Sequence, residues 1–218
     1  NKAEKSDVLK DHEIQTIYNN IQLNDFNMIS KEKARSILKI STNKQIILYG
    51  AQNPQSKRKG WEVFVESLKK IDKSKYLLCI FGKFWSQKTL DEIGIEYMNF
   101  GFINDNKKLN AIYSSADIFI ASSIQEAFGK TWAEAMACGT PVVCFKNTSA
   151  SEIIDHKQDG FIVEEADSQK LKEGIDWLCE EVKKKKFDNN LRNKIFNFDA
   201  NLIAKKYIDV YQKVLTYK

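Results

Sequence analysis

Residues 116–145 read ADIFIASSIQEAFGKTWAEAMACGTPVVCF, the part of the sequence that most clearly indicates the fold. Its two ends, 116–121 and 141–145, are rich in apolar and β-branched side chains, which is typical of buried strands. Between them, residues 129–137 are predicted to form a helix that ends at Gly139. A strand, a helix and a second strand in so short a stretch indicate a crossover between two neighbouring parallel strands.

The same alternation continues on both sides of this stretch. Further strands are predicted at 46–49, 76–81, 95–100 and 160–163, with a short one at 14–18. Helices are predicted at 31–39 (capped by Ser30), 59–71, 85–93, 105–115, 150–156, 168–184, 189–197 and 199–216. Because the strands are continuously apolar, we expect an α/β fold: a doubly wound, Rossmann-like parallel sheet of about six strands, followed by C-terminal helices. Such sheets bind ligands at the carboxyl ends of their strands.

The composition is that of an ordinary globular protein. The chain has 218 residues, 43% of them hydrophobic and 29% charged, with a net charge of +5. So small a charge does not predict nucleic-acid binding, and we expect neither a membrane span nor a signal peptide. The four cysteines form no C-x-x-C pair and only two histidines could join them, so no metal site is predicted. Free buried thiols favour a cytoplasmic location.

Several common catalytic motifs are missing. The first core strand is followed by Gly50, Ala51 and Gln52 rather than G-x-G-x-x-G, so a dinucleotide site is poorly supported. The chain contains no P-loop, no G-x-S-x-G elbow and no D-x-D pair. His12 and His156 are badly placed for a catalytic triad, and surface or capping roles are the simpler interpretation.

A basic run, Lys57-Arg58-Lys59-Gly60, stands where a helix is predicted to begin after the first core strand. A helix N-terminus carries partial positive charge, so three cations there conflict with the helix dipole. A bound anion would resolve the conflict, because cations and free amides would then act together. The alternative is a solvated basic loop.

Two carboxylates eight residues apart, Glu126 and Glu134, frame the central helix. Glu134 is surrounded by small apolar residues, so we expect it to be buried and to need partners such as ribose hydroxyls. Glu126 precedes the helix and could accept hydrogen bonds from a sugar, unless it only stabilises the helix dipole. Between them, the amides of Phe128, Gly129 and Lys130 could bind a diphosphate.

The stretch 126–143 resembles the donor-binding motif of retaining glycosyltransferases of family 4, the group 1 family. This family typically reads E-[GAS]-F-G-x-x-x-x-E-A-M-A-x-G-x-P-V-V, and the match is close. The resemblance covers nearly the whole chain, because five further segments are similar to family motifs: 19–26, 59–60, 99–103, 109–117 and 160–163.

The resemblance implies the GT-B architecture, in which two Rossmann-like domains face each other, and this chain is similar to the C-terminal, donor-binding half. It implies that Glu134 binds the ribose and Glu126 the transferred sugar. Lys59 and the amides of 128–130 would hold the diphosphate, and the base would lie against the backbone near Ile103. The implied division is an interdomain segment and first helix at 1–40, a nucleotide-sugar-binding domain at 41–198 and a C-terminal helix at 199–218.

The chain departs from the family pattern at Ala51, where an arginine is usual. Arg58 or Lys57 is the candidate replacement. A retaining enzyme of this family needs no general base on the donor domain, so Glu126, Lys59 and Arg58 are the expected catalytic residues. The cations would stabilise the leaving nucleoside diphosphate in place of a metal, and no cofactor is expected.

The implied activity is that of a hexosyltransferase that moves a sugar from a nucleoside-diphosphate sugar to a glycan or lipid-linked acceptor. The acceptor would bind an N-terminal domain absent from this chain, so the chain alone is expected to be inactive. Surface polysaccharide or glycolipid synthesis is the expected role, in the cytoplasm with peripheral association at the inner face of the membrane. The alternatives are another GT-B enzyme, such as a sugar-nucleotide epimerase or a phosphorylase, and a non-catalytic nucleotide-binding module.

Overall fold

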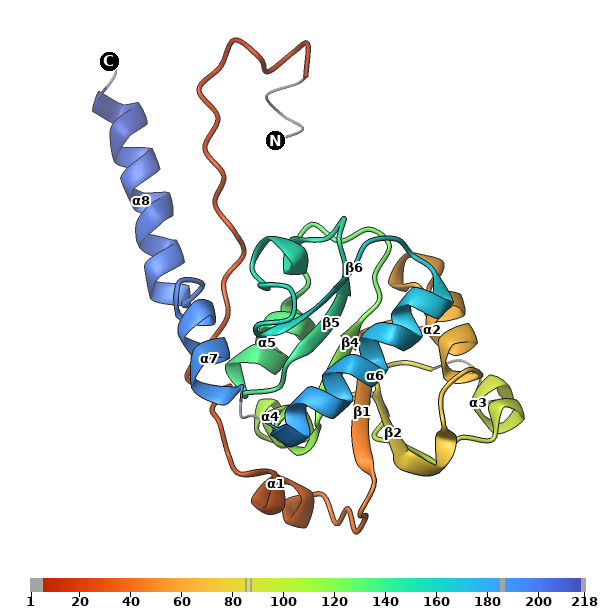
Figure 1. Cartoon of the computed structure of the whole chain (residues 1–218). Coiled ribbons are helices and arrows are strands. Elements are labelled where there is room, and N and C mark those ends of the chain that lie inside the picture. Colours follow the sequence, from red (N-terminus) through yellow and green to blue (C-terminus); the bar gives the residue numbers. More distant parts are fainter. Residues whose placement is uncertain (1–5, 85, 87, 185–186, 217–218) are drawn as a thin grey trace.

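The computed structural model describes residues 6–84, 86, 88–184 and 187–216. In this part of the chain six strands form one all-parallel sheet in the order β3-β2-β1-β4-β5-β6 (Figure 1). The strands are β1 (Gln45–Gly50), β2 (Tyr76–Phe81), β3 (Tyr97–Asn99), β4 (Ile118–Ala121), β5 (Val142–Phe145) and β6 (Gly160–Val163). The predicted doubly wound sheet is confirmed.

Helices cover both faces of the sheet. From β1 the chain proceeds towards β3, and from β4 it proceeds in the opposite direction towards β6, so right-handed crossovers place the two sets of helices on opposite faces. One face carries a row of neighbouring helices: α1 (Lys31–Ile37), α4 (Asn106–Ser115), α5 (Lys130–Ala137) and α7 (Asp188–Phe196). The other face carries α2 (Trp61–Leu68), α3 (Lys88–Ile93) and α6 (Ser168–Lys184), and α2 packs against both α3 and α6.

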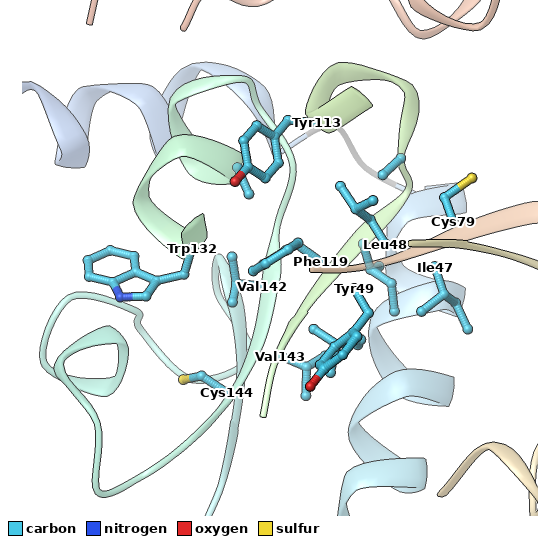
Figure 2. Packing of buried hydrophobic residues seen from close by; sticks show 14 of the residues in the cluster. Ile47, Leu48, Tyr49, Cys79, Tyr113, Phe119, Trp132, Val142, Val143 and Cys144 are labelled. Carbon is cyan, nitrogen blue, oxygen red and sulfur yellow. The ribbon is translucent and has the colours of Figure 1, made fainter. Parts of the chain in front are cut away.

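The core lies on both sides of the central strands, whose side chains are almost completely buried. On one side the ring of Tyr49 stacks on Phe64 with centroids 4.3 Å apart. On the other side Tyr113 of α4 and Trp132 of α5 lie over the sheet (Figure 2). All four cysteines are buried and free, as expected of small core residues.

The last helix, α8 (Ala200–Thr216), extends away from the sheet, and the N-terminal stretch runs beside it (Figure 1). Lys213 of α8 forms an ion pair with Glu13. Helix α8 also exposes five large apolar side chains: Tyr207, Ile208, Tyr211, Val214 and Leu215. Throughout the described residues no helix is long and apolar enough to cross a membrane.

The strand predicted at 14–18 is wrong. Within the part of the chain that the structure describes, this segment pairs with no strand of the sheet. The nearby backbone pairing is made by Ile21, which exchanges hydrogen bonds with Phe198 and Ala200. Tyr18 instead packs its ring against Phe198, with centroids 5.5 Å apart, and its hydroxyl donates to Glu152 at 2.6 Å. Side-chain packing rather than strand pairing therefore holds this segment.

The helix predicted at 150–156 is also wrong in type and length. The chain forms only a short 3-10 helix, η3 (Ser149–Glu152). Beyond it, Lys157 adopts a φ of 64° and donates its amide to Gly160, which turns the chain into β6. His156 accepts a hydrogen bond from the Ile162 amide at 3.0 Å, a structural role.

Two other predicted helices begin later than expected. The helix predicted at 59–71 is divided by Gly60: η1 (Lys57–Lys59), a 3-10 turn, precedes it and α2 begins after it. The helix predicted at 85–93 is present from Lys88 onwards, while Trp85 and Gln87 lie outside the described residues.

Candidate functional site

A cleft of about 330 Å³ opens at the carboxyl ends of β1 and β4. These adjacent strands continue in opposite directions, so the loops that follow them separate and leave a crevice, which is where doubly wound sheets bind ligands. Six of the predicted site residues line it: Arg58, Lys59, Glu126, Phe128, Gly129 and Lys130. Glu134 and Ile103 lie outside its lining.

The Lys59-Gly60 pair fixes one wall of the cleft. Gly60 has a φ of 68°, and a Cβ atom there would lie 2.0 Å from the carbonyl oxygen of Ser122. The two loops are also joined by hydrogen bonds, from Ser122 Oγ to the Lys59 carbonyl at 3.0 Å and from the Ile124 amide to the Arg58 carbonyl at 2.9 Å. Glycine is therefore required because the loop after β1 contacts the loop after β4 directly.

Glu126 pairs with both cations of the opposite loop. Lys59 Nζ donates to Glu126 Oε2, and Arg58 Nη1 lies 3.4 Å from Oε1. Ser123 Oγ donates to Oε2 at 3.3 Å. The side chains of Lys59 and Glu126 are only 16% and 13% exposed, whereas Arg58 is 55% exposed. Together Lys59, Arg58 and Glu126 carry one excess positive charge in the lining of the cleft.

The predicted conflict between the basic run and the helix dipole does not arise as expected. The cations lie in η1 rather than in the first turn of α2, and the nearby anion is Glu126 of the same chain. The basic run is therefore not simply a solvated loop, because Lys59 is largely buried against a carboxylate.

The N-terminus of α5 forms the opposite wall. Its N-cap is Gly129, which offers no side chain to accept hydrogen bonds from the first-turn amides. Those amides and the positive end of the helix dipole lie beside the cleft, an arrangement that favours an anion. Lys130, at the first helical position, is exposed and adds a further positive charge.

Phe128 and Gly129 also have packing roles. The Phe128 ring packs against Trp132 and Phe198, with centroids 5.4 and 5.6 Å away, so the backbone remains the part able to serve a ligand. A Cβ atom on Gly129 would lie 2.8 Å from the Trp132 ring. The expectation that this glycine serves ligand approach is therefore incomplete, because close packing of Trp132 already requires it.

Glu134 lies one turn further along α5. Its Oε2 accepts a hydrogen bond from the Tyr113 hydroxyl at 2.8 Å. Burial raises the pKa of Glu134 above its ordinary value, while the Tyr113 hydrogen bond and the charge of Lys130 act in the opposite direction. Glu134 is half-buried, less than the full burial expected from its small apolar neighbours, and its ribose role stays a prediction.

Backbone hydrogen bonds connect the loops that follow β1, β2 and β3. The Lys83 amide donates to the Gln52 carbonyl at 3.0 Å, and the Gly82 amide donates to Gly101 at 2.8 Å. Lys83 Nζ lies 4.8 Å from the ring centroid of Phe102, which is 46% exposed. The predicted base-binding residue, Ile103, is half-buried in the loop between β3 and α4.

The sequence reasoning missed the other polar residues that line the cleft: Gln52, Asn53, Ser56 and Thr131. Their position after β1 or at the start of α5 was the available signal. It also missed Tyr113 as the partner of Glu134. No three His, Cys, Asp or Glu side chains of the described residues are grouped to hold a metal ion, and metal-independence stays a prediction.

The chain is similar to proteins of a known family. The model of the family "Glycosyl transferases group 1" matches residues 30–196. An uncharacterized glycosyltransferase of Methanocaldococcus jannaschii, MJ1607, is 29% identical over 91% of this chain and 54% of its own length. The capsular polysaccharide biosynthesis glycosyltransferase CapM of Staphylococcus aureus is 24% identical over 90% of this chain and 53% of its own. The chain thus spans about half the length of these relatives.

Solved structures show the same fold. Anabaena Alr3699/HepE, solved in complex with UDP-glucose, aligns with a TM-score of 0.77 at 22% identity, over 91% of this chain and 57% of that one. The C-terminal domain of a group 1 glycosyl transferase, LpcC of Francisella tularensis, aligns with a TM-score of 0.63 at 23% identity, over 86% of this chain and 98% of that one. The predicted likeness to the C-terminal half of GT-B enzymes is confirmed.

Proposed function

Because the chain belongs to the group 1 glycosyl transferases, we propose that its cleft binds a nucleoside-diphosphate sugar as the donor of a retaining hexosyl transfer. One observation carries this proposal: Lys59, Arg58 and the uncapped N-terminus of α5 surround the cleft beside a single carboxylate, Glu126. A diphosphate matches the positive groups, and a sugar hydroxyl matches the carboxylate.

The diphosphate lies between Lys59, Arg58 and the first amides of α5 in this proposal. When the glycosidic bond to phosphate breaks, the leaving nucleoside diphosphate gains negative charge. Fixed cations and helix amides stabilise that charge without reorganising, which is the largest contribution the chain makes to catalysis. The Glu126 pairing holds Lys59 in place before the donor binds.

Glu126 is proposed to bind the transferred sugar. Its Oε2 is already shared by Lys59 and Ser123, whereas among the described residues Oε1 contacts only Arg58, at 3.4 Å. A sugar hydroxyl can therefore donate to Oε1 while Oε2 keeps its partners. Arg58, being more than half exposed, is free to turn towards the phosphates.

Glu134 and Ile103 serve the nucleoside in the same proposal, with Glu134 accepting ribose hydroxyls and the backbone near Ile103 contacting the base. The UDP-glucose complex of Alr3699/HepE supports a nucleotide-sugar donor, since its fold is shared. The capsular role of CapM supports a surface polysaccharide or glycolipid as product. Four buried free thiols support a reducing, cytoplasmic location. In this proposal the acceptor binds another part of the full-length protein, at the inner face of the membrane.

The direct test is calorimetric titration of the chain with UDP, GDP and ADP. One of the three should bind, and Lys59→Met should weaken it about 10- to 100-fold, since a charge-assisted hydrogen bond contributes about 1.5–3 kcal/mol. Lys44→Met is the matched control. Lys44 also forms an ion pair, with Glu96, but it directly precedes the first residue of β1, at the end of the strand away from the cleft.

Binding of no nucleotide, or equal affinity of the Lys59→Met variant, would refute the proposal. A full-length protein that binds the nucleotide sugar and never transfers the sugar would favour a non-catalytic binding module instead.

A further inference from the structure

Tyr113 connects α4 to the carboxylate of α5. Its hydroxyl donates to Glu134 Oε2 at 2.8 Å, and Glu134 Oε1 makes no hydrogen bond to any described residue. Lys130, one helical turn earlier, places a positive charge near this carboxylate. Glu134 thus has one oxygen fixed inside the protein and one oxygen available.

The ring of Tyr113 cannot move easily. It is fully buried and makes edge-to-face contacts with Phe26, Phe81 and Phe119, at centroid distances of 6.0, 5.6 and 5.8 Å. These three rings come from the N-terminal segment, β2 and β4, so three separate parts of the fold hold the hydroxyl in place. A hydroxyl held so firmly fixes the orientation of the carboxylate that it contacts.

We propose that Tyr113 is a positioning residue that orients Glu134, so that Oε1 faces the ribose hydroxyls of the bound nucleoside diphosphate. This inference rests on the proposed ribose role of Glu134. A glutamate has three rotatable side-chain bonds, and fixing one oxygen removes most of that freedom before the ligand arrives. Without the hydroxyl, the carboxylate would have to be ordered by the ligand itself, and part of the binding free energy would be lost.

The test compares Tyr113→Phe with the wild-type chain, using UDP, GDP or ADP, whichever binds, and its 2′,3′-dideoxy counterpart. Tyr113→Phe removes one oxygen and leaves the ring packing unchanged. Tyr76→Phe is the matched control, because Tyr76 is also a buried tyrosine whose hydroxyl faces a carboxylate, that of Asp176 at 3.4 Å, at the opposite end of the sheet.

We expect Tyr113→Phe to weaken binding of the ribonucleotide about five- to tenfold, the equivalent of one hydrogen bond, and to leave the dideoxynucleotide unaffected. Tyr76→Phe should change neither. Combining Tyr113→Phe with Glu134→Gln should add little to Glu134→Gln alone, because the two residues act on the same ligand group.

Two results would overturn the inference while leaving the proposed function intact: an equal loss for both nucleotides, which indicates a packing defect, or no loss for either. A wild-type chain that binds ribonucleotide and dideoxynucleotide equally well would refute the ribose role of Glu134, and the role of Tyr113 with it. Failure of the wild-type chain to bind any nucleotide would refute the proposed function and this inference together.

Discussion

Replacing Gly60 with alanine tests how the cleft is built. The backbone there has a φ of 68°, and the new Cβ would lie 2.0 Å from the Ser122 carbonyl oxygen. The left-handed conformation alone costs an L-residue about 1–2 kcal/mol. Relief of the overlap must separate the two loops and weaken the Ser122–Lys59 and Ile124–Arg58 hydrogen bonds, each of about 0.5–1.5 kcal/mol. The sum predicts a loss of about 2–5 kcal/mol of stability.

Gly94→Ala is the control for this prediction. Gly94 has nearly the same φ, 69°, but a Cβ atom there would meet nothing within 4 Å, so only the conformational strain should remain. Urea denaturation of both variants, followed by nucleotide titration, measures the difference. Gly60→Ala should be less stable than Gly94→Ala by at least about 1 kcal/mol, the value of one lost hydrogen bond, and should also bind nucleotide more weakly. Equal stability of the two variants would refute the claim that close contact between the loops requires this glycine.

Two further predictions follow from burial. Burial raises the pKa of the Glu134 carboxyl, so the folded chain holds the carboxyl proton more tightly than the unfolded chain does. The contribution of Glu134 to stability is therefore largest at acidic pH and declines as the pH rises through the folded pKa. Denaturation at several pH values should therefore show Glu134→Gln gaining stability relative to wild type as the pH rises from acidic to neutral; a constant difference would contradict this. Burial also raises the pKa of Cys79 and Cys144 to about 12, so a thiol reagent should label neither in the folded chain and both after unfolding, and rapid labelling of the native protein would contradict their placement in the core.

The sheet was predictable because its signal is local. Each strand is a short apolar run that ends near a turn residue, and the helix between β4 and β5 is bounded by Gly129 and Gly139. The failure at 14–18 has a physical origin in the same rule. Residues 14–18 (IQTIY) are also rich in β-branched and aromatic side chains, but they pack through side chains such as Tyr18. The residue pattern alone does not report whether a free strand edge is available.

The candidate site was predictable where the motif and the topology agree. Lys59, Glu126 and the start of α5 lie at the carboxyl ends of adjacent strands, which the strand order brings together. The pairing of Glu126 with Lys59 was not predictable, because it joins residues 67 positions apart and depends on how η1 contacts the loop after β4. The Tyr113–Glu134 hydrogen bond likewise depends on the spacing of two helices, which the sequence pattern does not encode.

The most direct measurement is a crystal structure of the chain with the nucleoside diphosphate that binds it. The account predicts density for a diphosphate within hydrogen-bond distance of Lys59 Nζ and the first amides of α5, with the ribose facing Glu134. A nucleotide bound elsewhere, with the Lys59–Glu126 cleft empty at saturating ligand, would contradict the central claim that this cleft is the donor site.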